Sequence, residues 1–333
     1  MNVLVTGGSG FIGTSLVRRL IERQHAVCIF DKEDSHKFPK LVCRGDVRDG
    51  AAVMAALKGR DLVYHLAAEH ADDVRPTSLY DDVNVDGTRH LVAALVEHGV
   101  RRAVFTSTVA LYGLNRGAPD EQTSIRPFNA YGRSKHKAEN LLLDWARADS
   151  RRSLTIVRPA VIFGEGNRGN VYNLLRQIHR NRFIQIGNGS NRKSMGYVEN
   201  ITAFLADWLT FPPGVRTFNY ADKADLTMNE LVLVARAAFG MRRDSHYRVP
   251  YLPALATAYC FDSVTRITGL RFPISSVRVK KFCAETVICT RTLTATGFRA
   301  PYSLEAGLRR MIAAEFLGGH PKPANDGHLK TGQ

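Results

Sequence analysis

A tyrosine and a lysine, Tyr131 and Lys135, stand four positions apart and could together carry out proton transfer. Residues at this spacing lie on the same face of a helix. An ammonium group beside a phenol favours the phenolate, so it should lower the tyrosine pKa toward the range of a general base. Thr108 follows an expected strand at 102–105, and its hydroxyl could hydrogen-bond the same substrate oxygen. These three side chains predict a site that takes a proton from a sugar hydroxyl group.

The start of the chain predicts a dinucleotide-binding unit. An apolar strand at 3–5 leads into Gly7, Gly10 and Gly13, and an amphipathic helix and a second strand ending at Asp31 follow. Glycines at this spacing permit a tight turn, close approach of the backbone to a pyrophosphate and close packing of helix on strand. The pyrophosphate would lie on free N–H groups at the start of the helix. The carboxylate of Asp31 would accept hydrogen bonds from the ribose hydroxyls of NAD and repel the 2′-phosphate of NADP.

Strands and helices continue to alternate along the first half of the chain. This order predicts an α/β fold in which residues 1–163 form a Rossmann-type, doubly wound parallel sheet. Side chains that follow such strands lie at the carboxyl edge of the sheet, where ligands bind. Asp46 should therefore meet the adenine, and Leu66, Ala67 and Ala68 should line the cofactor groove.

The sequence changes character after residue 163. Shorter, irregular elements predict a smaller mixed α/β substrate lobe at 164–318, from which a late strand near 215–221 returns to the first domain. Residues 319–333 are rich in Gly, Pro, His and Lys and predict a disordered tail.

The composition narrows the kinds of partner. The 333 residues carry a net charge of +15, which suits a nucleotide sugar, a lipid diphosphate or an anionic membrane face. No nucleic-acid-binding module is recognised, so we expect no nucleic acid. Five cysteines without CxxC pairs or nearby histidines predict reduced thiols and no metal site. Met1 leads directly into the first strand, and no apolar run of about eighteen residues follows, so we expect a cytoplasmic protein that does not span a membrane.

Taken together, these motifs resemble those of the extended short-chain dehydrogenase/reductases, the NAD-dependent epimerase/dehydratase family. The resemblance reaches to about residue 318 and rests on 6–13, Asp31, Asp46-Val47, 65–68, Asn84, Thr108 with 111–113, Tyr131 with Lys135, and Arg158-Pro159. It implies that Thr108, Tyr131 and Lys135 are catalytic and that Lys135 also holds the nicotinamide ribose of NAD. The implied cofactor contacts are Gly7, Gly10, Phe11, Ile12, Gly13, Asp31, Asp46, Val47, Leu66, Ala67, Ala68, Asn84, Tyr131, Lys135 and Pro159.

The residues after Thr108 limit which of this family's reactions we expect. Dehydratases usually have acidic residues there, whereas this chain has Val109 and Ala110. Segments 68–74, 168–175, 193–200 and 275–282 resemble the bacterial 4-epimerases that act on N-acetylglucosaminyl-diphospho-undecaprenol in O-antigen synthesis. The resemblance implies a homodimeric isomerase with tightly held NAD. The implied substrate contacts are Glu69, His70, Asn170, Arg192, Lys193 and Tyr197.

Two features fit a lipid-linked substrate. Tyr197 stands where UDP-sugar epimerases commonly have a histidine, which argues against their uridine pocket. Residues 249–261 carry no charge, and 251–300 contains seven Lys or Arg against two Asp or Glu. This stretch is too short and too rich in proline to cross a bilayer, but it could lie at the inner face of the cytoplasmic membrane. A buried helix beneath a basic surface is the alternative interpretation.

The residues suggest a reversible oxidation at the sugar C4 hydroxyl. Tyr131 would take the hydroxyl proton while Thr108 holds the oxygen, and Arg192 or Lys193 would hold the diphosphate. NAD⁺ would accept the C4 hydride and return it to the other face of the 4-keto sugar. Three alternatives stay open: epimerisation of a UDP-N-acetylhexosamine, a 4-ketosugar reductase that consumes reduced cofactor, and a non-catalytic protein that senses NAD.

The first prediction concerns Tyr131. Replacing it with Phe removes the proton acceptor without changing the shape of the side chain, so turnover should be abolished while NAD stays bound. Assays of epimer formation together with the cofactor content of the purified variant check this. An unimpaired Tyr131→Phe enzyme would remove Tyr131 from the mechanism.

Overall fold

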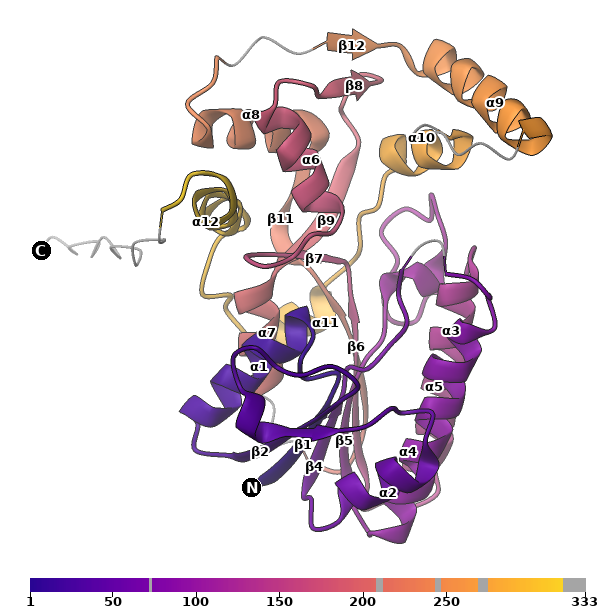
Figure 1. Ribbon diagram of the computed structural model, residues 1–333, viewed down its shortest axis with the longest axis vertical. Coiled ribbons are helices and arrows are strands. Elements are labelled where there is room, and N and C mark those ends of the chain that lie inside the picture. The colour runs from indigo at the N-terminus through magenta and orange to yellow at the C-terminus, as the bar shows by residue number, and fades with distance from the viewer. Residues whose placement is uncertain (72–73, 208–211, 243–246, 269–274, 320–333) are drawn as a thin grey trace, which may run out of the picture.

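Seven parallel strands form the main sheet in the computed structural model, which describes residues 1–71, 74–207, 212–242, 247–268 and 275–319. The strand order is β10-β6-β5-β4-β1-β2-β3. The strands are β1 (Asn2–Thr6), β2 (Ala26–Asp31), β3 (Val42–Arg44), β4 (Leu62–His65), β5 (Arg102–Thr106), β6 (Ser153–Pro159) and β10 (Gly214–Tyr220). The predicted α/β fold with a doubly wound parallel sheet is confirmed (Figure 1).

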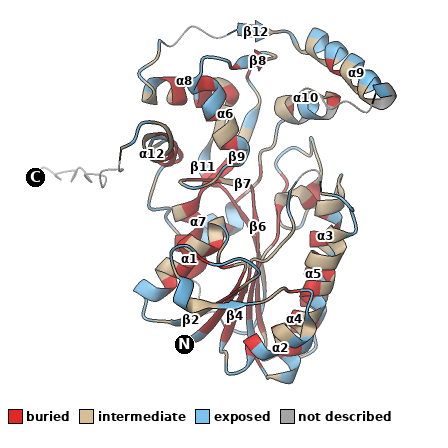
Figure 2. Cartoon of the chain, in the orientation of Figure 1, coloured by how far each residue is buried: buried red, intermediate tan, exposed pale blue. Residues whose placement is uncertain are grey.

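Helices cover both faces of this sheet. On one face lie α1 (Phe11–Glu22) and α7 (Val198–Asp207), and on the other lie α2 (Gly50–Leu57), α4 (Gly87–Glu97) and α5 (Ala130–Arg147) (Figure 1). The central strand β1 is therefore buried on both sides, with Val3 and Val5 in one apolar core, Leu4 in the other, and all three 0% exposed. Figure 2 shows the same pattern as buried strands flanked by helices that are exposed on their outer sides.

Short helical pieces connect these elements. The helical segment before β5 begins as α3 (Leu79–Asp81), passes through a π-helical turn (Asp82–Asp86) and continues as α4. Two 3₁₀ turns, Pro39–Leu41 and Val109–Tyr112, precede β3 and follow β5. The second turn begins directly after Thr108, whose hydroxyl accepts a hydrogen bond from the N–H of Ala110 at 3.1 Å.

The smaller lobe is built on a separate three-stranded sheet, ordered β11-β9-β7. Its strands are β7 (Val161–Phe163), β9 (Arg192–Tyr197) and β11 (Asp222–Thr227), and β8 (Ile184–Ile186) pairs separately with β12 (Tyr247–Val249). Helices α6 (Asn170–His179), α8 (Met228–Ala238) and α12 (Leu304–Phe316) enclose its apolar core. Helices α9 (Tyr251–Thr268), α10 (Ser276–Cys283) and α11 (Arg291–Ala295) complete the described part.

The chain crosses between the two parts several times. β7 already belongs to the sheet of the lobe, and β10 lies beside β6 in the main sheet. We expected such a return for the late strand but not for α7, whose Ile201, Phe204 and Leu205 pack with the α1 side of the main core. Asp72 and Asp73, part of the subgroup resemblance, and residues 320–333 of the expected tail lie outside the described residues.

Three further observations concern the described residues. No helix there combines the length and apolar character needed to cross a bilayer. No cluster of three or more potential metal ligands is found within them. All five cysteines are free thiols.

Candidate active site

The glycine turn after β1 has no room for larger side chains. Gly7 has a φ of +71°, and a Cβ there would lie 2.6 Å from the backbone nitrogen of Ala67. A Cβ on Gly13 would lie 2.3 Å from the carbonyl oxygen of Gly7. Gly10 caps α1, which has no acidic residue in its first turn, so free N–H groups are available to an anion. The turn has the geometry expected for a dinucleotide pyrophosphate.

Two carboxylates mark the adenosine end of the groove. Asp31 ends β2 and accepts hydrogen bonds from the N–H groups of Ser9 (3.0 Å) and Glu33 (3.1 Å). Asp46 accepts a hydrogen bond from Arg48 Nη2 at 2.6 Å, which holds its pKa below the ordinary value. Val47 beside it is buried. Asp31 therefore occupies the predicted strand end, whereas the Asp46 carboxylate is already paired with an arginine.

A buried histidine ties the glycine turn to the end of β4. His65 Nδ1 lies 2.7 Å from the Thr6 hydroxyl, and Nε2 lies 3.1 Å from the Thr88 hydroxyl. Because Thr88 donates its proton to the carbonyl of Asn84 (2.6 Å), it must accept from His65 Nε2–H, so Thr6 donates to Nδ1. Burial lowers the His65 pKa to about 3, consistent with a neutral ring. The Thr6 oxygen also accepts from the N–H of Ala67 (3.3 Å), which fixes the groove backbone.

Asn84 joins the loop after β4 to α5. Its side-chain oxygen accepts from the N–H of Glu69 (2.9 Å), and its nitrogen donates to the Glu69 carbonyl (3.0 Å) and to Ser134 Oγ (2.8 Å). The Glu69 carboxylate accepts from the N–H groups of His70 and Ala71. The structure thus gives Asn84 a positioning role. The predicted cofactor contact of Asn84 and substrate contacts of Glu69 and His70 stay predictions.

Tyr131 lies in the first turn of α5, whose N-cap is Asn129. The Thr108 side chain lies near enough to act on the pKa of Tyr131, so the structure places these two predicted catalytic residues close to each other. Burial raises the pKa of Tyr131 to about 12; Thr108 opposes this shift and Tyr80 adds to it. We expected Lys135 to lower this pKa. In the protein without cofactor, loss of hydration is the larger effect and the pKa moves the other way.

Lys135 is buried one turn further along α5. Its side chain is 1% exposed, and Nζ lies 4.1 Å from the centre of the Phe105 ring. Burial lowers the pKa of Lys135 to about 7, while the charge of Glu139 raises it. The ring and the carboxylate replace only part of the lost hydration. A hydroxyl group that accepts a hydrogen bond from Nζ would therefore favour the charged form, which fits the predicted ribose contact.

A buried ion pair fixes α5 to the sheet. Arg158 in β6 donates two hydrogen bonds to the Glu139 carboxylate, at 2.9 and 2.6 Å, and the two side chains are 7% and 1% exposed. Arg158 also donates to the Tyr112 hydroxyl (2.8 Å), which donates to Asn219 Oδ1 (2.7 Å). Asn219 in β10 donates to the carbonyl of Cys289 (3.2 Å). One polar network therefore holds together α5, β6, β10 and the segment before α11.

The sequence did not reveal this network as a unit. Arg158 and Tyr112 were part of the motif set, but Glu139 and Asn219 were not singled out. The available signal was that Glu139 lies four positions after Lys135 and so on the same helix face. No local pattern links it to Asn219, because the contact is made through the fold.

Tyr197 lies in the core of the lobe rather than at a substrate-facing position. Its side chain is 0% exposed, its hydroxyl donates to Glu165 Oε1 (2.8 Å), and Arg310 Nε donates to it (3.0 Å). Burial and the neighbouring Glu165 raise its pKa above the ordinary value. A Cβ on Gly307 would lie 2.7 Å from the Tyr197 ring, so α12 covers this position directly. The expected substrate contact is therefore corrected: Tyr197 packs the lobe.

The other predicted substrate residues come from separate elements. Lys193 in β9 is partly buried, and its Nζ donates to the carbonyl of Ala284. Burial lowers the pKa of Lys193 to about 8. Arg192 in the same strand and Asn170 at the start of α6 are exposed. Only the exposed groups are available to a diphosphate without breaking an internal hydrogen bond.

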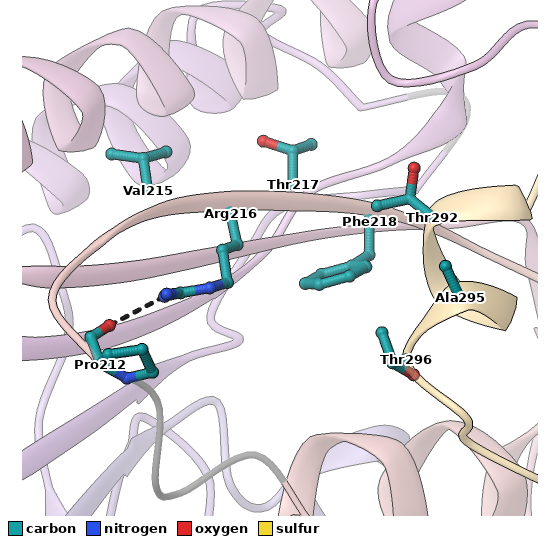
Figure 3. Close-up of a pocket in the computed structure, with 8 residues that line it drawn as sticks. All are labelled: Pro212, Val215, Arg216, Thr217, Phe218, Thr292, Ala295 and Thr296. Carbon is teal, nitrogen blue, oxygen red and sulfur yellow. Dashed lines mark hydrogen bonds between the residues drawn. The ribbon is translucent and has the colours of Figure 1, made fainter.

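A shallow surface hollow of ≈ 720 Å³ lies between β10 and α11 (Figure 3). Val215 and Thr217 from the strand and Thr292 and Thr296 from the α11 region line it. Arg216 and Pro212 also line it, and Arg216 donates a hydrogen bond to the carbonyl of Pro212 at 2.8 Å. The hollow includes the amino end of β10, whereas Thr108 and the glycine turn follow the carboxyl ends of β5 and β1. It is therefore separate from the candidate active site.

The groove at the carboxyl edge fits a dinucleotide. Thr106 Oγ1 and Ser107 Oγ, at the end of β5, are buried and have no hydrogen-bond partner among the described residues. Buried hydroxyls normally have partners, so their state indicates a group that the chain does not supply. The remaining predicted contacts lie at strand ends of this edge or at the start of α1: Phe11, Ile12, Leu66, Ala67, Ala68 and Pro159.

Comparison with known proteins agrees with this fold and groove. Residues 3–219 match the model of the NAD dependent epimerase/dehydratase family. The chain belongs to this family, and NAD is its cofactor.

Individual relatives show which members of the family this chain resembles. The chain is 48% identical over 318 residues to the N-acetyl-alpha-D-glucosaminyl-diphospho-ditrans,octacis-undecaprenol 4-epimerase of Escherichia coli O157:H7, covering 95% of this chain and 96% of that protein. It is 32% identical to the 2-alkyl-3-oxoalkanoate reductase of Stenotrophomonas maltophilia, covering 94% and 99%. Among solved structures, MoeE5 in complex with UDP-glucose and NAD matches with a TM-score of 0.72 and 26% identity, covering 94% and 97%.

The buried ion pair gives a stability prediction. Arg158→Met leaves the Glu139 carboxylate buried and unpaired, so the free energy of unfolding should fall by about 3–5 kcal/mol. The double variant Arg158→Met/Glu139→Leu removes both charges and should recover a large part of that loss. Urea unfolding of both variants measures the difference. Equal losses in the single and double variants would show that the pair is not what holds α5.

Burial of Lys135 gives a pH prediction. Its pKa is about 7 in the folded protein and about 10.4 when unfolded. Between these values the unfolded chain binds more protons, so this residue makes stability rise with pH across the window and is least favourable below pH 7. Unfolding of cofactor-free protein should show a rise of roughly 4–5 kcal/mol across the window, relative to Lys135→Met. The same pH dependence in both proteins would contradict the assignment.

Proposed function

We propose that this protein is an NAD-dependent 4-epimerase that interconverts N-acetylglucosamine and N-acetylgalactosamine on undecaprenyl diphosphate, for surface polysaccharide synthesis such as O-antigen. The observation that carries the proposal is the 48% identity with the undecaprenol-linked 4-epimerase over 95% of the chain. The paired Thr108 and Tyr131, with Lys135 buried on the same helix, support it. Val109 and Ala110, in place of acidic residues, argue against a dehydratase.

In the proposed mechanism the chain moves one proton and positions one oxygen. Thr108 holds the 4-oxygen of the sugar, and Tyr131 takes its proton. The glycine turn, Asp31 and Lys135 would hold NAD⁺, which would supply the acceptor and donor of the hydride at the sugar C4. Because burial raises the Tyr131 pKa to about 12 in the cofactor-free protein, nearby positive charge is needed to favour the phenolate. Lys135 in its charged form supplies part of that charge.

The diphosphate of the substrate requires a cation near the lobe. Arg192 is exposed, whereas the Lys193 ammonium already donates to the carbonyl of Ala284. Arg192 is therefore the better candidate, and Lys193 would serve if the substrate drew it from that carbonyl.

A 4-ketosugar reductase is the second candidate. The 32% identity with the 2-alkyl-3-oxoalkanoate reductase, over 94% of this chain, is the observation that favours it. A reductase would use the same Thr108, Tyr131 and Lys135 but would consume reduced cofactor with each turnover. Steady loss of NADH absorbance with a keto-sugar would identify it.

A homodimer formed through two helices beside the sheet is also part of the proposal. Its basis is the likeness to the family rather than a contact in this structure. The molar mass of the purified protein in solution, measured by light scattering, distinguishes the dimer from a monomer.

The deciding experiment gives purified protein two substrates in parallel without added cofactor. These are N-acetylglucosaminyl-diphospho-undecaprenol in detergent and UDP-N-acetylglucosamine. We expect the 4-epimer, scored by chromatography after mild acid release, from the lipid-linked sugar. Conversion of the UDP-sugar alone would assign the protein to the nucleotide-sugar epimerases, and conversion of neither would favour the reductase.

A further inference from the structure

The end of the lobe beyond α6 and α8 exposes apolar side chains to solvent. Tyr247 in β12 is 80% exposed, and Leu252 at the start of α9 is 74% exposed. Ile184 in β8 is 51% exposed and stands opposite Tyr247 in the register of the β8–β12 pair. Partners in register point to the same face of a sheet, so Ile184 and Tyr247 form one apolar surface. These elements lie together at the top of Figure 1.

Helix α9 extends this apolar surface. Tyr259 and Val264 are 47% and 40% exposed, so apolar groups face solvent along the helix. The acidic side chain of Asp262 instead accepts a hydrogen bond from the N–H of Ser276 in α10. Figure 2 shows α9 beside α10 at the edge of the molecule, with intermediate and exposed residues over most of its length. Exposed apolar surface of this kind marks an interaction site rather than a packed core.

Basic side chains accompany the apolar ones. Arg182 precedes β8, and Arg278 and Lys280 lie in α10, all exposed. Lys280 Nζ donates to the Tyr259 hydroxyl at 2.8 Å and lies 5.2 Å from the centre of its ring. Cations beside exposed aromatic and aliphatic groups are complementary to anionic headgroups over an apolar layer. The net charge of +15 favours the same partner.

The chain that follows α10 runs from this exposed surface toward the candidate active site. After α10 the chain passes Thr286, which bridges to Lys193 in β9. It then reaches Ile288, which packs in a small apolar cluster with Ala160, Ala221 and Val109. Val109 directly follows Thr108, so one short stretch connects the exposed surface with the wall beside the catalytic threonine.

We propose that β8, β12 and α9 form a docking surface for an anionic phospholipid bilayer. Ile184, Tyr247 and Leu252 enter the interface while the neighbouring arginines and Lys280 contact headgroups. The proposal rests on the lipid-linked substrate proposed above, whose undecaprenyl chain stays in the bilayer. Docking places α10 and the segment after it between the membrane and Thr108, so the sugar diphosphate reaches the site without leaving its membrane.

Vesicle flotation of the full chain tests this surface without any sugar. We compare vesicles containing phosphatidylglycerol with vesicles of phosphatidylcholine alone. Wild-type protein should float with the anionic vesicles and be released by salt. Tyr247→Glu and Leu252→Glu should each reduce the bound fraction about tenfold, because each removes an apolar contact and adds repulsion. Leu233→Glu in α8, at a leucine that is 41% exposed, is the matched control and should bind like wild type.

Failure to bind anionic vesicles, full binding by Leu252→Glu, or an equal loss in Leu233→Glu would each overturn the docking surface. A second readout separates this proposal from the proposed function. Leu252→Glu should lose turnover of lipid-linked sugar in vesicles but keep turnover of a water-soluble short-chain analogue. Wild-type flotation without turnover of any sugar would reject the proposed epimerase and support the docking surface. Turnover without flotation would support the epimerase and reject the docking surface.

Discussion

The active site depends on the burial of charged side chains along one face of α5. A buried charge costs several kcal/mol unless partners replace its hydration. Glu139 meets this requirement through its two hydrogen bonds with Arg158. Lys135 has the ring of Phe105 and the charge of Glu139, and burial lowers its pKa to about 7. Hydrogen bonds to Arg158 thus replace the lost hydration of the Glu139 charge. The lost hydration of the Lys135 charge is replaced only in part, at the position where the cofactor ribose is expected.

The same constraint links proton transfer to cofactor binding. Burial raises the Tyr131 pKa to about 12, so burial alone keeps this side chain a phenol, which is a poor proton acceptor. Hydrogen bonds donated by Lys135 Nζ to the hydroxyls of a bound ribose would favour the ammonium form of this side chain. That ammonium and the positive charge of NAD⁺ would each favour the phenolate of Tyr131. In the proposed mechanism Tyr131 would become a competent base once the oxidised cofactor is bound, which suits a reaction in which the cofactor does not need to leave.

The sequence could predict the elements and residues whose positions depend on a local pattern of residue types. The apolar run of β1, the glycine turn and Asp31 follow from strand periodicity and backbone sterics, and the structure places them at one sheet edge. Thr108 follows the carboxyl end of β5, and Tyr131 lies in the first turn of α5. The order of strands and helices in that sheet places the two residues near each other. Tyr197 could not be placed in this way, because α12, from more than a hundred residues later, decides which face of β9 is covered. The sign of the Tyr131 pKa shift likewise depends on burial, which the spacing of Tyr131 and Lys135 does not reveal.

The central claim is a reversible oxidation at C4 in which the same hydride returns to the sugar. A substrate labelled with deuterium at C4 tests it directly, with purified enzyme, no added cofactor and mass spectrometry of the released epimer. The account predicts that the N-acetylgalactosamine product keeps the deuterium at C4, because the hydride is held within the site between its removal and its return. Loss of the label to solvent during epimerisation would contradict it.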